Sequence, residues 1–376
     1  MMMHSRVPVF LVWLVTFVAY SVAYTTFGSS IAVLAEVLAL GPIEIGALAS
    51  ALSVGFLTTF PGGILSDKID KRMIVSSGLA VSSVGLAAIG LSSSFVGCFL
   101  SAVLLGIGAG VYEAAMNPLV LELFPERRAF ALGSAHLCWG VGGFIGPLLV
   151  GYAYSTWFDW RLAFYVTSIL VVVGLVAFLA VRAPATSQID PNVGQQNFRL
   201  TDLKSLWRLM FGNLLAWGIE GSIVAWLIIF LTTERGLDFL LATSSLSIFF
   251  LLQAVGKPIW GIFADKYGYV TAVKICSGVG GIVLFSAIVT SRGILPLVLM
   301  APTGFLLGGV IPNLTTAACS RFQSASGAAS GMINLAGDIG SIILPFVFGV
   351  VVAFSNAFWG FVWVSSLAVL VAFISK

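Results

Sequence analysis

Charged residues are scarce in this sequence. Only 9% of its 376 residues are Asp, Glu, Lys or Arg, whereas 59% are hydrophobic. A soluble chain carries about 25% charged residues, so this one has too few charges to cover a water-facing surface. Its mean hydropathy of +1.07 and its repeated apolar runs, each long enough to cross a bilayer, predict a polytopic helical membrane protein.

Residues typical of catalytic and metal centres are also few. The chain has two histidines and four cysteines, and the cysteines lie inside apolar segments without metal-type spacing. It has no Walker loop, no HExxH motif and no convincing nucleophile–base pair. We therefore predict no enzymatic activity, no metal, no cofactor and no nucleic-acid partner, and any transport is expected to run on gradients rather than on ATP.

Breaks of charge, proline and glycine divide the chain into twelve predicted membrane-spanning helices. Residues 1–182 hold six of them and residues 205–376 the other six, with a polar cytoplasmic linker over 183–204. With the N-terminus inside, only Arg161, Arg235 and Arg292 fall on the outer side. The positive-inside rule then places both termini in the cytoplasm and the protein in the cell membrane. The predicted spans are approximately 7–34, 44–66, 73–92, 95–122, 129–153, 161–182, 206–232, 240–264, 270–290, 294–318, 326–350 and 355–375.

One constant offset relates the two halves. Gly63 and Asp67 recur 198 positions later as Gly261 and Asp265. Six spans return the chain to the same side of the membrane, so the two repeats run parallel. Parallel repeats with a site near the midplane are a transporter architecture, and they predict two pseudo-symmetric six-helix bundles. The same offset also joins Gly106 to Gly304, Gly110 to Gly308, Phe124 to Phe322, Gly133 to Gly331, Pro147 to Pro345 and Gly151 to Gly349.

The paired loops carry a specific resemblance. The segment Gly63-x3-Asp67-Lys68-x-Asp70-Lys71-Arg72 resembles the loop signature of the major facilitator superfamily, with Asp70 in place of the family's glycine. The second loop, Gly261-x3-Asp265-Lys266-x-Gly268, keeps that glycine. The resemblance implies the twelve-helix major facilitator fold, transport by alternating access, and a central cavity lined by spans 1, 4, 7 and 10.

Two shorter motifs bear on the transported solute. Glu113-Ala-Ala-Met-Asn117-Pro118 in span 4 and Gly218-Ile219-Glu220, followed by Trp226, in span 7 resemble fucose-permease-like sugar/proton symporters. Gly142-x3-Gly146-Pro147 in span 5 is similar to a motif of antiporters. The first likeness favours proton-coupled uptake of a monosaccharide-like solute, and the second leaves proton-driven efflux of a drug or metabolite as the alternative. A transporter-like sensor without flux is a third possibility.

Ionisable groups inside the spans are the main site candidates. Glu113, Glu220 and Asp338 lie close to the middle of spans 4, 7 and 11, where a carboxylate costs about 2.5–3.5 kcal/mol on insertion scales. We expect one glutamate to carry the coupling proton, or another cation, and the other to bind the solute. Asp338 lies on a polar stripe that the repeat maps onto the region of His136 in span 5, and Asn117 lies one turn from Glu113.

Further candidates fall into two groups. A broad face of span 1 carries four aromatic residues, Trp13, Tyr20, Tyr24 and Phe27. We expect side chains from this span and from other spans to line the central cavity. Lys257 is expected to extend towards the cytoplasmic surface, with a solute anion or Asp338 as the alternative partner. The two charged loops are expected to act as a cytoplasmic gate, and the transporter to function as a monomer in the lipid bilayer. The cavity-lining candidates are Tyr24, Trp217, Trp226, Asn334 and Gln253, and the gate residues are Asp67, Lys68, Arg72, Asp265, Lys266, Arg127 and Arg128.

Overall fold

The computed structural model divides the chain into two compact units, Met1–Ser187 and Gln188–Lys376. It describes residues 2–66, 68–123, 128–181, 203–290, 294–322 and 326–375, with the side chains of 2–7, 117, 120–123, 128–136, 203, 296 and 326–328 excepted. The predicted linker over 183–204 therefore lies almost entirely outside the described residues.

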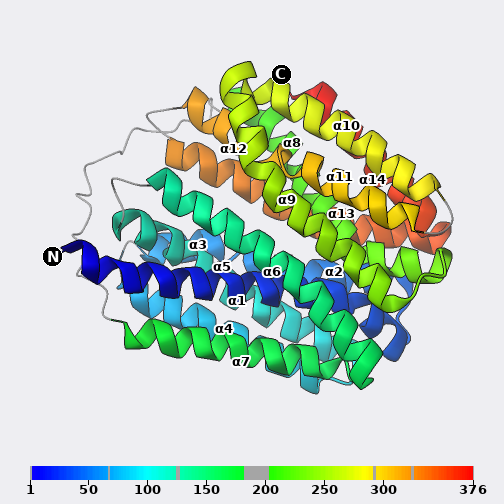
Figure 1. Ribbon diagram of the computed structural model, residues 1–376, viewed down its shortest axis with the longest axis horizontal. Helices are drawn as coiled ribbons and strands as arrows, with labels where there is room; N and C mark the ends of the chain where they lie inside the picture. The colour runs from blue at the N-terminus through cyan, green and yellow to red at the C-terminus, as the bar shows by residue number, and fades with distance from the viewer. Residues whose placement is uncertain are drawn as a thin grey trace. The chain divides into compact units, whose positions relative to one another are not determined.

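The membrane-spanning helices match the predicted ones in number. Over the described ranges, twelve helical stretches are long and apolar enough to cross a membrane, from Pro8–Val37 to Ala357–Ile374. The predicted all-α membrane fold is confirmed. Six of these stretches fall in each unit, and Figure 1 shows the helices of each unit running side by side.

In the first unit, two helices form the centre of the packing. The first helix, α1, packs against α6 and α7, while α5 packs against α2, α3 and α4, and α4 also contacts α7. Small residues along α5 and α6 allow these close approaches. The helices are α1 (Met2–Val37), α2 (Pro42–Phe56), α3 (Thr59–Ser66), α4 (Lys71–Leu91), α5 (Phe95–Leu123), α6 (Arg128–Trp157) and α7 (Arg161–Ala180).

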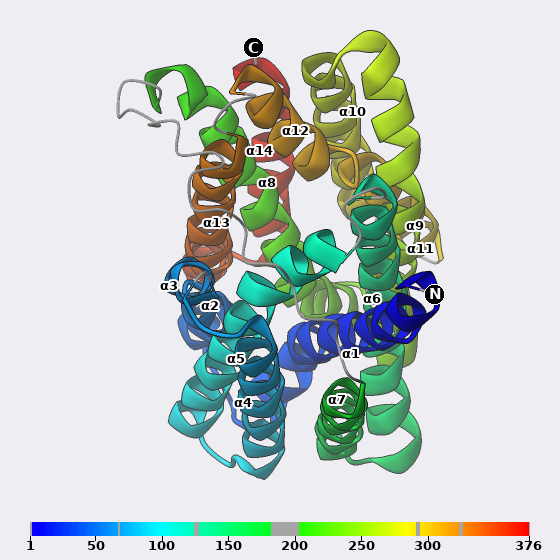
Figure 2. The same cartoon turned by 90° about the vertical axis from the view of Figure 1, so that its left-hand side faces the viewer.

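The second unit repeats these pairings. Helix α8 packs against α13 as α1 packs against α6, α11 packs against α9 as α5 packs against α2, and α10 contacts both α11 and α14. Figure 2 shows α9, α10 and α11 grouped together. The elements are α8 (Leu203–Ile229), the π-helix η2 (Phe230–Glu234), α9 (Phe239–Tyr267), α10 (Tyr269–Val289), α11 (Leu295–Leu307), α12 (Val310–Arg321), α13 (Ser326–Phe354) and α14 (Ala357–Ile374).

Prolines break two spans that the sequence predicts as continuous. The second span divides into α2 and α3 at Leu57–Thr58, and the tenth into α11 and α12 at Gly308–Gly309. Pro61 and Pro312 each stand four residues after the start of the break, so the carbonyl groups of Leu57 and Gly308 lose the amide donor that an unbroken helix would supply. Hydroxyl and amide side chains stabilise the breaks: Thr58 donates to the carbonyl oxygen of Gly55 at 2.8 Å, and Asn313 to that of Gly309 at 2.7 Å.

Repeat-related glycines bring the same helix pairs into backbone contact in both units. A Cβ atom on Gly106 of α5 would collide with the carbonyl oxygen of Leu52 on α2, and one on Gly304 of α11 with that of Phe249 on α9. Only glycine permits such an approach. The repeat predicted from sequence is therefore built into the packing of each unit.

Candidate functional site

Glu113, the carboxylate of span 4, is held by a tyrosine from span 1. The Tyr20 hydroxyl on α1 donates to Glu113 Oε2 on α5 at 3.0 Å. Beside it, the hydroxyl groups of Tyr112 and Thr16 are 3.0 Å apart, and both of these side chains are buried. We call Thr16, Tyr20, Tyr112 and Glu113 the Glu113 cluster.

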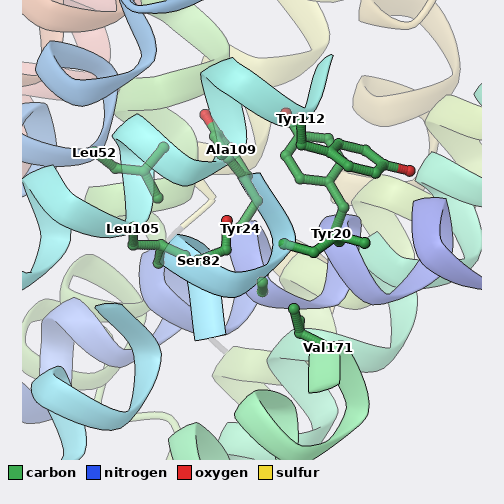
Figure 3. Close-up of a pocket in the computed structure, with 10 residues that line it drawn as sticks. Tyr20, Tyr24, Leu52, Ser82, Leu105, Ala109, Tyr112 and Val171 are labelled. Carbon is green, nitrogen blue, oxygen red and sulfur yellow. The ribbon is translucent and has the colours of Figure 1, made fainter. Parts of the chain in front are cut away.

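Aromatic rings pack around Tyr20, the hydrogen-bond partner of Glu113. The ring centroids of Tyr20 and Tyr112 are 5.3 Å apart, and Trp139 of α6 lies 5.7 Å from Tyr20 and 5.1 Å from Tyr24. Figure 3 shows the Tyr20 and Tyr112 rings side by side at a small cavity that Tyr24 also lines. Glu113 thus lies in an aromatic environment in which its described hydrogen-bond partner is one neutral hydroxyl group.

Glu220, the carboxylate of span 7, has a different environment. Gln253 Nε2 on α9 donates to Glu220 Oε2 at 2.8 Å. Lys257 lies one turn along α9 from Gln253, so it shares the helix face from which Gln253 reaches Glu220. We call Glu220, Gln253 and Lys257 the Glu220 cluster. The structure thus relates Lys257 to Glu220, whereas the sequence suggested the cytoplasmic surface, a solute anion or Asp338.

Two buried polar atoms near Glu220 have no hydrogen-bond partner among the described residues. One is the side-chain oxygen of Gln253, a residue that is only 1% exposed. The other is the indole nitrogen of Trp217, which lies three residues before Glu220 and packs against Gly337 of α13. A buried polar group without a partner costs free energy, so both atoms have unused capacity for a hydroxyl group or a water molecule.

Each unit contains a small cavity, and the two are related by the repeat. The first is lined by Leu79, Ala109 and Tyr112, and the second by their counterparts 198 positions later, Ser277, Leu307 and Val310. Each has room for little more than a water molecule, which excludes a monosaccharide from both. Besides these counterparts, Glu220 lines the second cavity, together with Ala216, Ile219, Phe249, Ile311, Ala368 and Val371.

Trp226, a predicted cavity-lining residue, makes packing contacts within its own unit. It is 1% exposed, its indole nitrogen donates to the carbonyl oxygen of Pro345 at 3.2 Å, and its ring stacks on Phe348 with centroids 5.0 Å apart. These contacts explain a tryptophan here without a solute. Tyr24, by contrast, is half-buried beside Trp139.

The remaining predicted site residues are described only in part. Asp338 is half-buried on α13, where its backbone carbonyl oxygen accepts from the Ser341 hydroxyl at 2.9 Å, and Asn334 is exposed. Asn117 on α5 and His136 on α6 belong to described helices, but their side chains lie outside the described part of the structure. Their predicted roles remain predictions.

Comparison with known proteins identifies the family. The sequence profile of the Major Facilitator Superfamily matches residues 12–345. The chain belongs to the major facilitator superfamily. It is thus a multi-pass membrane transporter and not an enzyme, as the sequence predicts.

Relatives of this major facilitator transporter include carriers of organic acids. A cis,cis-muconate transport protein of Acinetobacter baylyi is 26% identical over 343 residues, which cover 86% of this chain and 82% of the relative. A probable L-galactonate transporter of Escherichia coli is 26% identical over 254 residues, or 61% of this chain and 55% of the relative. A bacterial homologue of the human lysosomal transporter Spinster, solved in an inward-facing and occupied conformation, has a TM-score of 0.83 at 15% identity, covering 99% of this chain and 96% of that one.

The two charged loops of this transporter lead into the next helix in different ways. In the first, Asp70 caps α4 by accepting from the Arg72 amide at 2.9 Å. In the second, Gly268 has a φ of +93°, which favours glycine, and joins α9 directly to α10. Asp70 and Gly268 are equivalent in the repeat, so a side-chain cap replaces the glycine turn in the first loop.

Of the predicted gate residues, Arg72 has the clearest role. Its guanidinium group donates to the carbonyl oxygens of Val181 at 2.7 Å and Phe178 at 3.2 Å, at the C-terminal end of α7. Arg72 thus stabilises the end of a helix in its own unit. Lys68, Asp265 and Lys266 are exposed, and Asp265 accepts from the Tyr269 hydroxyl at 3.0 Å. Asp67 and Arg127 lie outside the described residues, as does the side chain of Arg128.

The antiporter-like motif of α6 is a helix contact. A Cβ atom on Gly142 or Gly146 would collide with Ser21 or Thr25 of α1. These two hydroxyl groups donate to α6 carbonyl oxygens, Ser21 to Trp139 at 2.6 Å and Thr25 to Gly142 at 3.1 Å. The packing of α1 on α6 accounts for the glycines, so the motif by itself does not favour export.

Helix packing adds four residues that the sequence does not assign to these clusters: Thr16, Tyr20 and Tyr112 near Glu113, and Lys257 near Glu220. Tyr20 was grouped with the aromatic face of span 1 but not with the site, because its distance from Glu113 depends on how α1 packs on α5. From the sequence, Lys257 is expected at the cytoplasmic surface, with a solute anion or Asp338 as the alternative partner, because the one-turn spacing from Gln253 is visible but the position of Glu220 is not. The available signal was a polar pair, Gln253 and Lys257, on one face of an apolar helix.

Proposed function

We propose that this transporter takes up a small polar organic solute, of about monosaccharide size, by proton-coupled alternating access. The observation that carries the proposal is that each unit holds a carboxylate near the middle of a membrane-spanning helix, and that each of these two carboxylates accepts a hydrogen bond from a neutral side chain on a neighbouring helix. Tyr20 holds Glu113 and Gln253 holds Glu220. Ionisable groups at such depth are costly, and they are functional candidates by default.

The solute class follows from two sources. The span 4 and span 7 motifs resemble those of sugar/proton symporters, and the two relatives are named for cis,cis-muconate and L-galactonate, which are carboxylates. The tyrosine and tryptophan rings near Glu113 offer apolar faces and polar edges that suit hydroxylated solutes, but the cavity beside them must open beyond the size of a water molecule to admit one. Monosaccharides and sugar acids are therefore the first compounds to test.

Proteoliposomes containing the purified transporter provide the test. An inward proton gradient should drive accumulation of the solute, whereas accumulation under the opposite gradient would indicate export and binding without flux a sensor. Glu113→Gln or Glu220→Gln should abolish gradient-driven accumulation but spare solute exchange. Glu44→Gln, at the exposed start of α2, is the matched control. Normal accumulation in both membrane variants would refute the coupling role.

The placement in the membrane belongs to the same proposal. We place the protein in the cell membrane with both termini in the cytoplasm, because the Lys and Arg residues gather on that side of the predicted spans. We also propose that it functions as a monomer. The loops with Asp67 and Asp265 would then be cytoplasmic gates. A reporter domain fused to the C-terminus that becomes active outside the cytoplasm would overturn this orientation.

A further inference from the structure

Lys257 is a cation within a membrane-spanning helix. It lies on α9 between the buried Gln253 and the exposed Asp265 and is itself half-buried. A lysine at this depth needs a negative partner or a path to water. The structure places a candidate partner nearby, because Gln253, one turn from Lys257 on α9, donates to Glu220 of α8 at 2.8 Å.

Few charged residues lie on the elements that pack against α8, the helix of Glu220. Of the charged residues on described elements that pack against α8, Lys257 is the one that lies one turn from Gln253, the hydrogen-bond donor to Glu220. A negative group brought to Lys257 would therefore compete directly with Glu220. The other charged residues on those elements are Asp265 and Lys266 on α9, Arg321 on α12, Asp338 on α13 and Glu234 on η2.

Gln253 provides an additional feature of a binding site. Its amide nitrogen donates to Glu220 at 2.8 Å, while its buried side-chain oxygen has no partner in the described structure. This oxygen can accept from a hydroxyl group next to Lys257. A cation and a buried acceptor on one helix face match a solute that has a carboxylate next to a hydroxyl group. A neutral sugar would leave the cation without a partner. A phosphate ester can carry two negative charges, whereas Lys257 supplies one positive charge.

We infer that Lys257 binds the carboxylate of an anionic solute and that Glu220 is the counter-ion which the solute displaces. The inference rests on the proposed function, because it assumes that the protein moves a polar solute. When the solute carboxylate takes over Lys257, Glu220 loses its cation and accepts a proton from the water, so one negative charge stays beside Lys257. Release of the solute lets the proton leave and the original pair form again.

Binding to purified variants tests the inference. The anionic probes are galacturonate, galactonate and cis,cis-muconate, and the neutral probes are galactose and galactitol; ligand-induced thermal stabilisation measures binding. Lys257→Met should weaken carboxylate binding roughly 10- to 100-fold, as expected for the loss of a charge-assisted hydrogen bond. Lys257→Arg should retain most of the binding. Lys274→Met, on the exposed side of α10, is the matched control and should behave as wild type.

The variant Glu220→Gln separates this role from a structural one. It removes the competing charge while keeping the shape of the side chain, so carboxylates should bind at least as tightly as to wild type. If Lys257→Met does not fold, Lys257→Arg and Glu220→Gln still decide the matter. Tenfold weaker carboxylate binding in Glu220→Gln would overturn the inference, as would wild-type binding in Lys257→Met.

The two proposals fail in different ways. Proton-driven accumulation of neutral sugars alone would refute the role of Lys257 but leave the proposed function standing. A wild-type protein that no carboxylate probe stabilises would also count against the inference. A third outcome would refute proton-coupled uptake but leave the anion site intact. In it, a proton gradient drives accumulation of no solute, whereas the wild-type protein still binds carboxylates and Lys257→Met does not.

Discussion

Replacing Arg72 by methionine should separate a helix-capping role from a gating role. In the structure its guanidinium group donates to two carbonyl oxygens, Val181 at 2.7 Å and Phe178 at 3.2 Å, and lies 5.7 Å from the Phe178 ring. A third carbonyl oxygen, that of Leu179 at 3.5 Å, is too distant to add much. The variant Arg72→Met keeps an apolar stem but removes the charge and every donor.

The expected loss follows from these contacts. Each hydrogen bond contributes about 1 kcal/mol once partial exposure is taken into account, and the charge at the C-terminus of α7 adds about 0.3–1 kcal/mol. The sum is about 2–3 kcal/mol. In a unit of this size, 1 kcal/mol corresponds to about 2–4 °C in Tm, so the Tm should fall by about 4–12 °C.

Thermal unfolding of the purified protein, monitored as the loss of monodisperse transporter, measures this shift in Tm. The solute concentration that gives half-maximal uptake should stay unchanged, because Arg72 is not part of either glutamate cluster. Arg72→Lys should recover part of the stability, since a single ammonium group can reach one carbonyl oxygen but not both in the same geometry. A wild-type Tm in Arg72→Met, together with an altered balance of inward- and outward-open states, would refute the capping role and favour the gate.

Three further substitutions test the packing. Gly340→Ala should destabilise the protein by about 1–3 kcal/mol, because the added Cβ would collide with α8. Gly331→Ala on the same helix is the control, since its Cβ would meet nothing within 4 Å and the change should be neutral. Equal Tm values for the two variants would contradict the close α8–α13 contact. Glu234→Ala removes the acceptor for two amide groups at the start of α14 and should cost about 0.5–2 kcal/mol, again read from the Tm. Trp226→Phe loses the hydrogen bond to Pro345 and replaces the buried indole with a smaller phenyl ring, so it should lower stability by about 1–3 kcal/mol without changing solute affinity. A tenfold change in affinity would instead place Trp226 at the solute site.

The sequence alone determined the fold class and the repeat. Too few charges and repeated apolar runs require membrane-spanning helices, because the bilayer core solvates neither charged groups nor unpaired backbone amides. The constant offset between Asp67 and Asp265 and their loop motifs led to the family. Glu113 and Glu220 also stood out without a structure, because a carboxylate in the middle of an apolar run is costly wherever it faces.

The sequence contains a proline near each of the two helix breaks, but its apolar runs predict continuous spans there. Pro61 and Pro312 each remove one backbone donor, and the sequence marks both positions. Prolines also occur inside unbroken helices such as α6 and α13. Whether a proline bends or divides a helix depends on the neighbouring groups around the break, such as Thr58 and Asn313, which donate to the carbonyl oxygens of Gly55 and Gly309.

Only the tertiary structure decided which side chains meet. Tyr20 and Glu113 are 93 residues apart and Gln253 and Glu220 are 33 apart, and their contacts depend on the rotation of each helix about its axis. Local sequence constrains that rotation weakly in a membrane, since lipid-facing and core-facing positions are both apolar. For the same reason the sequence does not show that Lys257 lies one turn from the Gln253–Glu220 contact or that Arg72 donates at the end of α7, and the gate role of Arg72 stays a prediction.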